Sequence, residues 1–254
     1  MYTLKKSLGQ HFLKDELVCK QIIDALTVDS FSQLVEVGPG GGALTKYLIQ
    51  LPGISFKAIE LDEEKVTYLE KTFPSLQGSI INESVLDTEK PFDGSFTVIG
   101  NFPYNISTQI LFRIIEWESD VPLVIGMFQK EVAQRAAAPA GNKVYGVLSV
   151  LIQYFYDVEY LFEVGEQSFT PPPKVKSAVI RLRRRSERFD VTSVKNFFNL
   201  VKTAFMQRRK TLRNSVRGLY EPEVLADSLF DKRPEQLTVE QFAALTFRMR
   251  NAIS

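Results

Sequence analysis

The stretch of sequence that decides the fold is Glu36-Val37-Gly38-Pro39-Gly40-Gly41-Gly42-Ala43-Leu44-Thr45, which places a glycine cluster between a predicted strand and a predicted helix. Glycine lets the backbone turn sharply and approach a ligand closely, and α/β sheets bind nucleotide-like molecules at such turns. Gly38, Gly40 and Ala43 also satisfy the G-x-G-x-x-A spacing of dinucleotide-binding turns. We therefore expect Gly38 and Gly40 to line a site for an adenosine-containing cofactor.

Around this turn, short β-rich runs alternate with longer helical patterns, which is typical of a parallel sheet covered by helices. Strands are predicted at residues 33–37, 55–60, 79–82, 96–99, 121–128 and 177–183, and helices at 43–50, 63–73 and 107–117. The predicted fold class is α/β, a Rossmann-like sheet with helices on both faces.

The chain beyond about Asp190 shows helical patterns only, with predicted helix starts at Thr192-Ser193 and Thr238 and a break at Glu221-Pro222. We therefore predict two domains, a cofactor-binding domain at residues 1–188 and a small all-α domain at residues 189–254.

Charge is distributed unevenly along the chain, although the total of 31 Lys and Arg against 30 Asp and Glu is nearly balanced. Residues 171–254 alone hold 18 Lys and Arg against 8 Asp and Glu. Such a density favours a surface that faces a polyanion such as nucleic acid. The alternative is a helical tail whose charges only keep it soluble.

Cysteine and histidine each occur once, as Cys19 and His11. This excludes an internal disulfide and argues against a zinc site or a Ser-His-Asp triad, so no metal is expected. No apolar run reaches membrane-spanning length, and the N-terminal charges are not followed by an apolar signal region. We expect a cytoplasmic protein that does not enter a membrane.

Glu60 follows Gly38 at the end of the second predicted strand, where a carboxylate can accept hydrogen bonds from both ribose hydroxyls. NAD and S-adenosylmethionine both carry such a ribose, so a dehydrogenase and a methyltransferase both remain possible at this point. A surface glutamate beside an ordinary turn is the simpler alternative.

Asn101-Phe102-Pro103-Tyr104 follows another predicted strand and favours a methyltransferase. The N6 nitrogen of adenine is a poor nucleophile, so methylation needs acceptors for its hydrogens, and the Asn101 side chain and the Phe102 carbonyl can supply them. Tyr104 would stack on an extruded base. The motif therefore predicts N6 methylation with S-adenosylmethionine, which leaves S-adenosylhomocysteine. A turn with a buried aromatic is the alternative.

Phe169 begins a stretch that continues Thr170-Pro171-Pro172-Pro173-Lys174-Val175, whose prolines exclude a helix and stiffen a loop. Phe169 could close the second face of the target base, opposite Tyr104. It could equally be a core aromatic at the edge of a domain.

Six separated blocks of this chain resemble the small-subunit rRNA adenine dimethyltransferases of the KsgA type. The blocks are residues 6–13, 36–45, 101–108, 128–135, 169–179 and 204–215, which follow one another in the expected order. The resemblance implies a class I methyltransferase that dimethylates N6 of two adjacent adenosines in the 3′-terminal hairpin of 16S rRNA. Its implied substrate is an assembling small ribosomal subunit, and a monomer is the simplest expectation.

The resemblance also implies roles for individual residues. His11 and Leu13 would contact the cofactor, Gly38 its methionine portion and Glu60 its ribose, with Asn101 where cofactor and target meet. Phe169 gains support as a stacking residue. The expected RNA-binding residues are basic: Lys174, Arg208, Arg209, Lys210 and Arg213.

This chain departs from the family pattern at three positions. Ser84 stands where the family has an acidic residue that binds the cofactor adenine, so either Ser84 or its neighbour Glu83 would take that part. Phe102 replaces a common leucine, with little expected effect because its carbonyl is the working group. Val147 stands where a basic residue usually follows Tyr145-Gly146.

Two further interpretations compete with this one. A large-subunit rRNA methyltransferase of the antibiotic-resistance type shares the catalytic domain, although residues 207–214 favour the small-subunit type. A non-enzymatic assembly factor with the same fold is the other, and the intact Asn101 to Tyr104 motif argues against it.

Overall fold

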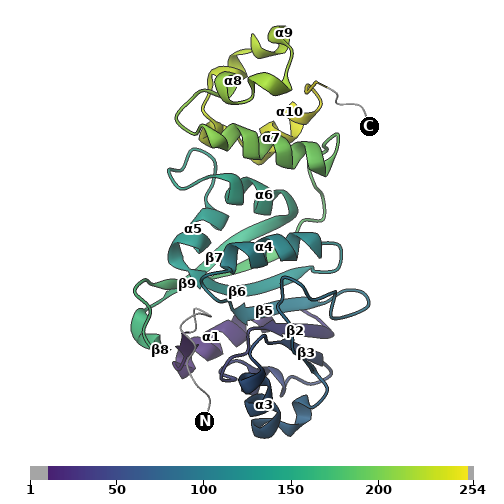
Figure 1. Ribbon diagram of the computed structural model, residues 1–254, viewed down its shortest axis with the longest axis vertical. Coiled ribbons are helices and arrows are strands. Elements are labelled where there is room, and N and C mark those ends of the chain that lie inside the picture. The colour runs from purple at the N-terminus through teal and green to yellow at the C-terminus, as the bar shows by residue number, and fades with distance from the viewer. Residues whose placement is uncertain (1–10, 251–254) are drawn as a thin grey trace. The chain divides into compact units, whose positions relative to one another are not determined.

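The computed structural model describes residues 11–250, which divide into two compact units (Figure 1). The first unit contains the described residues up to Ala133 together with Val158–Arg184, and the second contains Gln134–Asp157 and the residues from Arg185 onward. Residues 6–10 of the first family block lie outside the described part. The segment Gln134–Asp157 groups with the tail because it carries a helix whose Tyr154 ring packs on Phe197, with ring centroids 4.4 Å apart.

The first unit is built on a seven-stranded sheet in the order β4-β3-β2-β5-β6-β9-β7. Its pairs from β4 to β6 are parallel, and β9 runs antiparallel to β6. The strands are β2 (Gln33–Val37), β3 (Ser55–Ile59), β4 (Ile80–Ile81), β5 (Thr97–Asn101), β6 (Leu123–Gln129), β7 (Tyr156–Val164) and β9 (Ser177–Arg184). This sheet confirms the predicted α/β fold class.

The register of the parallel strands brings the sequence motifs to one edge. Val37 is opposite Ile59, and Glu36 is opposite both Ala58 and Ile99. The residues that follow β2, β3 and β5 therefore lie side by side at the carboxyl edge of the sheet, which is where open α/β sheets bind ligands.

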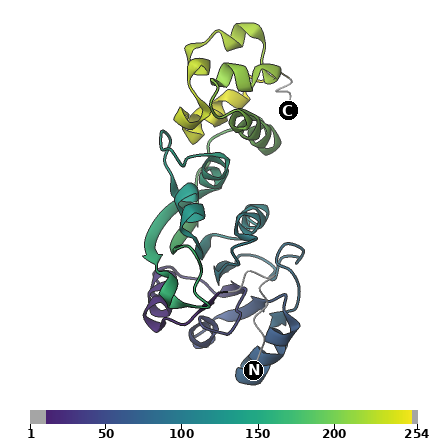
Figure 2. The same cartoon turned by 60° about the vertical axis from the view of Figure 1, so that its left-hand side comes forward.

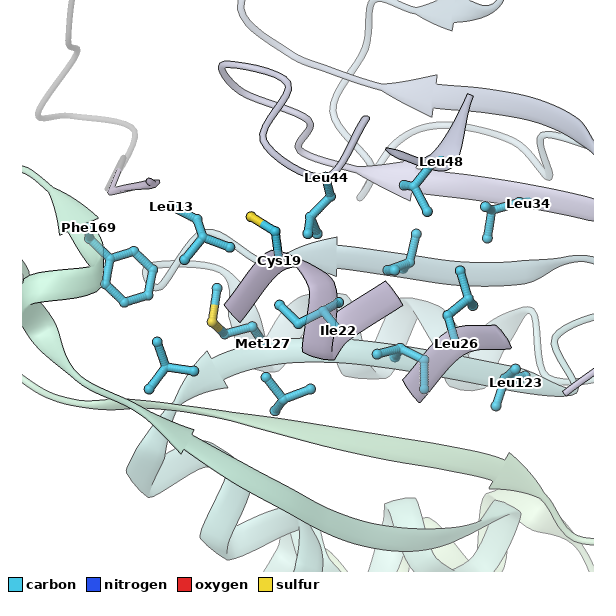
Figure 3. Packing of buried hydrophobic residues seen from close by; sticks show 14 residues of the cluster. Leu13, Cys19, Ile22, Leu26, Leu34, Leu44, Leu48, Leu123, Met127 and Phe169 are labelled. Atoms are coloured by element: carbon cyan, nitrogen blue, oxygen red, sulfur yellow. The ribbon is translucent and has the colours of Figure 1, made fainter. Parts of the chain in front are cut away.

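Helices cover both faces of this sheet, with α1 and α4 on opposite sides (Figures 1 and 2). The helices are α1 (Glu16–Thr27), α2 (Thr45–Leu48), α3 (Glu63–Thr72), α4 (Ser107–Glu116) and α5 (Lys130–Ala137), with 3₁₀ turns η2 (Pro74–Leu76) and η3 (Glu166–Ser168). On the α1 side, Cys19, Ile22 and Leu26 pack against the sheet in one apolar cluster (Figure 3). Burial of such side chains supplies the main stabilisation of the unit.

A second, two-stranded sheet joins β1 (Phe12–Leu13) to β8 (Phe169–Thr170), with Phe12 opposite Thr170 and Leu13 opposite Phe169. Asp15 follows this segment and caps the start of α1, because its carboxylate accepts hydrogen bonds from the amides of Leu17 and Val18. The hydroxyl of Ser168 donates to the same carboxylate. The N-terminal segment is thereby attached to the proline-containing loop.

The second unit is helical apart from the start of β7. Its helices are α6 (Val147–Phe155), α7 (Val194–Met206), α8 (Leu212–Ser215), α9 (Pro222–Leu225) and α10 (Val239–Thr246), with 3₁₀ turns η4 (Arg217–Leu219), η5 (Ser228–Asp231) and η6 (Pro234–Gln236). Ser193 and Thr238 cap α7 and α10, which confirms the two predicted starts. The predicted break falls where α9 begins, because Pro222 occupies a first-turn position that tolerates proline. Within residues 11–250, no helix has the length and apolar character needed to span a membrane.

Candidate active site

Two cavities adjoin at the carboxyl edge of the sheet and share Gly38 and Pro103 in their walls. The larger, of about 340 Å³, is lined by the glycine turn, by His11, Phe12 and Leu13, and by Asn101 to Tyr104. The smaller, of about 150 Å³, is lined by Glu60, Glu83 and Ser84 among apolar side chains. The structure therefore gathers these sequence-predicted residues around one site.

The glycine turn needs glycine at two of the predicted positions. Gly38 and Gly40 have φ angles of +70° and +56°, a region that disfavours side chains. A Cβ on Gly40 would lie 3.0 Å from Cε1 of Phe12. The amide of Gly38 donates to the carbonyl of Ile59 at 2.9 Å, which joins the turn to β3.

Glu60 lies directly after β3 and is 7% exposed. One carboxylate oxygen accepts from the amide of Gly40 at 3.1 Å, and the other accepts from the amide of Asp62 at 3.0 Å. Burial raises the pKa of this carboxyl, while the two amide hydrogen bonds oppose the rise. Each oxygen keeps a lone pair for a further donor, as two ribose hydroxyls would require.

Ser84 and Glu83 both line the smaller cavity. The Ser84 hydroxyl oxygen accepts from the amide of Leu86 at 3.2 Å. A hydroxyl oxygen has two lone pairs, so the Ser84 oxygen can accept a second hydrogen bond. Val85, Leu86 and Ile106 complete a wall that suits an aromatic base.

The Asn101 side chain is oriented by the N-terminal segment. Its amide nitrogen donates to the backbone carbonyl of His11 at 3.1 Å. Because a carbonyl only accepts, the nitrogen must face His11, and the side-chain oxygen is the atom left to accept from another group. Asn101 lines the larger cavity.

Phe102 anchors the turn that follows β5. Its ring is fully buried, 4.9 Å from that of Phe128 between ring centroids, and its amide donates to the carbonyl of Met127 at 3.1 Å. A Cβ on Gly126 would lie only 2.5 Å from this ring, so the strand beside it must carry glycine here. The packing of the Phe102 ring and the hydrogen bond of its amide therefore fix the position of the Phe102 peptide group.

Tyr104 is partly exposed in the larger cavity and is held from two sides. Its hydroxyl shares a hydrogen bond with the buried hydroxyl of Ser177, and its ring lies 5.3 Å from that of His11 between centroids. His11 in turn donates from Nδ1 to the carbonyl of Pro171 at 2.8 Å. His11 therefore links the Asn101 to Tyr104 turn to the proline loop.

Phe169 occupies a different place from the one the stacking hypothesis expects. It is fully buried in the apolar cluster near Leu13 and Met127 and does not line either cavity (Figure 3). Its backbone pairs with Leu13 of β1, and a stacking role opposite Tyr104 stays a prediction that requires the ring to leave this cluster.

Glu36 is a site residue whose role the sequence motif did not indicate. It is 2% exposed, lines the larger cavity, and accepts from the Thr45 hydroxyl at 2.6 Å. Burial raises the pKa of its carboxyl to about 8; the Thr45 hydrogen bond lowers the pKa and the nearby charge of Glu60 raises it. The only sequence feature that indicated a place for Glu36 in the site is its position at the start of the glycine-containing stretch.

The predicted RNA-binding residues lie in both units. Lys174, Arg208, Arg209 and Lys210 are exposed, and Arg208 also donates to the carbonyl of Lys143. Arg213 is held within the second unit, because it donates to the carbonyl of Leu225 and pairs with Asp231, each at 2.9 Å. Among the described residues no cluster of three or more His, Cys, Asp or Glu side chains could hold a metal ion.

This sheet, its glycine turn and the Asn101 to Tyr104 turn together define a Rossmann-like methyltransferase of class I. The sequence model for ribosomal RNA adenine dimethylases matches residues 1–250. The chain belongs to this family of S-adenosylmethionine-dependent rRNA adenine dimethyltransferases.

Close relatives agree with this assignment, and solved structures share the fold. The ribosomal RNA small subunit methyltransferase A of Flavobacterium johnsoniae is 51% identical over 95% of this chain and 94% of its own length. That of Cytophaga hutchinsonii is 48% identical over 95% of both chains. A dimethyladenosine transferase from Plasmodium falciparum shares the fold, with a TM-score of 0.78, 24% identity and coverage of 91% of this chain and 94% of that one. The 23S rRNA methyltransferase ErmE shares it at a TM-score of 0.68 and 23% identity over 92% of this chain and 99% of its own.

The residues of the site fit S-adenosylmethionine. Glu60 offers acceptors for two ribose hydroxyls, and the smaller cavity offers apolar walls and the Ser84 hydroxyl for adenine. Gly38 and Gly40 have no side chains and therefore leave room in the larger cavity for the rest of the cofactor. These features belong to this chain and do not depend on the family comparison.

Proposed function

We propose that this chain transfers two methyl groups to N6 of each of two adjacent adenosines in the 3′-terminal hairpin of 16S rRNA. The proposed substrate is an assembling small ribosomal subunit, on which the protein would act as a cytoplasmic monomer. The observation that carries the catalytic part is the Asn101 side chain, whose amide nitrogen is held by His11 while its oxygen is left to accept.

The cofactor, when bound, supplies a methyl group already activated on a sulfonium centre. Glu60, Ser84, Gly38, Gly40, His11 and Leu13 are the residues proposed to hold it. Asn101 and the carbonyl of Phe102 would accept the hydrogens of the adenine amino group and thereby release its lone pair from the ring. Removing one preorganised acceptor of this kind costs roughly a hundredfold or more in rate.

Tyr104 is proposed to position the target base. Its hydroxyl is held by Ser177, so its ring keeps one orientation in the cavity wall and can stack on an extruded adenine. Base stacking of this kind contributes about 1–3 kcal/mol. No side chain near Asn101 needs to act as a strong base, because the amino proton can leave to water after transfer.

RNA binding is assigned to Lys174 and to the exposed residues Arg208, Arg209 and Lys210. Arg213 is proposed to contribute mainly by holding α8 to residues 225–231, since its guanidinium already has two partners. Neutral replacement of any one phosphate-binding side chain should weaken binding to every RNA sequence alike and should reduce the salt dependence of that binding.

The large-subunit alternative is less favoured, because the relatives that share about half of the residues carry the small-subunit name. The deciding experiment incubates the protein with labelled S-adenosylmethionine and unmodified small or large subunits, and then maps the modified nucleotides. We expect dimethyladenosine at two adjacent positions of the small subunit. Label confined to the large subunit would overturn the proposal, and a wild-type rate with Asn101→Ala would overturn its catalytic part.

A further inference from the structure

An ion pair lies in the wall of the larger cavity, between the first turns of two helices. Lys46 in α2 binds the carboxylate of Glu16 in α1, and both residues line the cavity. The hydroxyl of Tyr47 donates to the same carboxylate. The hydrogen bonds from Lys46 and then Tyr47 lower the pKa of Glu16, which favours its charged form.

Lys46 is the one lysine or arginine among the described residues that line this cavity. Two glutamates, Glu16 and Glu36, lie in the same wall. Among the described residues that line the cavity, Lys46 is therefore the one lysine or arginine side chain that can pair with an anionic group entering it.

The smaller cavity determines which end of the cofactor reaches Lys46. Glu60 and Ser84 are placed for ribose and adenine, and the two cavities meet at Gly38 and Pro103. With the adenosine in the smaller cavity, the amino-acid end must extend into the larger one. That end carries the only carboxylate of S-adenosylmethionine.

Exchange of partners by Lys46 should be easy. The side chains of Lys46 and Glu16 are 36% and 54% exposed, and exposed ion pairs contribute little stability. Glu16 would keep the hydrogen bond from Tyr47 after Lys46 turned away. We infer that Lys46 binds the carboxylate of the cofactor, an inference that rests on the proposed use of S-adenosylmethionine.

The test compares two ligands that differ only by this carboxylate. Calorimetry would measure the binding of S-adenosylhomocysteine and of its decarboxylated analogue to wild type and to Lys46→Met. We expect the substitution to weaken S-adenosylhomocysteine about tenfold and the analogue by less than about twofold. Lys46→Arg should keep most of the affinity, because it retains the charge.

Lys90→Met is the matched control, since Lys90 forms a similarly exposed ion pair with Asp120 and lines neither cavity. It should leave both affinities unchanged. Equal weakening of the two ligands by Lys46→Met would show that Lys46 only ties α2 to α1 and would overturn the inference. Unchanged binding of both would also overturn it. A wild-type protein that binds neither ligand would instead refute the proposed function itself.

Discussion

The side-chain amide of Asn101 donates to the backbone carbonyl of His11, which is ninety positions earlier in the chain, at 3.1 Å. This hydrogen bond makes the N-terminal segment responsible for presenting the Asn101 oxygen to the cavity. His11 also contacts the Tyr104 ring and the carbonyl of Pro171. One residue therefore contacts Asn101, Tyr104 and the proline loop, the first two being the proposed acceptor and the proposed stacking residue.

Loss of the Asn101 side chain should impair the chemical step more than cofactor binding. We expect Asn101→Ala to lower kcat about a hundredfold or more, because a preorganised acceptor for the amino hydrogens is lost. Steady-state and single-turnover methylation of undermethylated small subunits would measure kcat and the rate of the chemical step, and calorimetry would measure S-adenosylhomocysteine binding. A wild-type kcat would remove Asn101 from the reaction.

Replacement of Glu60 by glutamine should weaken the cofactor site. Both carboxylate oxygens accept from backbone amides, so the variant must turn its NH₂ group towards the amide of either Gly40 or Asp62. The loss of a charged acceptor costs about 1.5–3 kcal/mol, or roughly 10-fold to 150-fold in affinity. Binding of S-adenosylhomocysteine to Glu60→Gln would test this. Glu63→Gln, an exposed neighbour, should bind like wild type.

Much of the fold follows from local patterns in the sequence, and β2 matches its prediction residue for residue. The motifs after β2, β3 and β5 were also located, because parallel strands bring their carboxyl ends to one edge. The pairing of Phe12–Leu13 with Phe169–Thr170 could not be found this way. Each segment is only two residues long, and the pairing joins distant parts of the chain, so neither carries a strand pattern of its own.

The same limit applies to the site. Asn101, Tyr104 and Glu60 stand in recognisable motifs, whereas the contacts of Glu36 with Thr45 and of Lys46 with Glu16 depend on packing between elements. For Phe169, a motif predicted a stacking role, but its burial beside the N-terminal segment could not be predicted from the sequence.

The buried carboxyl of Glu36 should make stability depend on pH. Its pKa is about 8 in the folded protein, mainly through burial, against an ordinary value of 4.5. Between these values the folded state binds a proton that the unfolded state has lost, so the free energy of unfolding should fall as pH rises. Glu36→Gln resembles the neutral carboxyl and should flatten this dependence.

Thermal melting of wild type and Glu36→Gln across this pH window would measure the difference between their slopes. Glu89→Gln is the control, because its side chain is exposed and should keep the wild-type slope. Parallel pH profiles for wild type and Glu36→Gln would contradict the raised pKa.

The burial of Phe169 leads to a test that separates packing from base stacking. Phe169→Leu keeps an apolar side chain in the cluster but removes the aromatic face, and such swaps usually cost less than about 1.5 kcal/mol of stability. Because the ring has no exposed surface, we expect kcat/KM to remain within about twofold of wild type. Tyr104→Leu, which removes the ring that lines the cavity, should lower kcat/KM by roughly 5-fold to 150-fold. Equal losses in the two variants would show that β1 and β8 separate during the reaction and that Phe169 stacks on the target base.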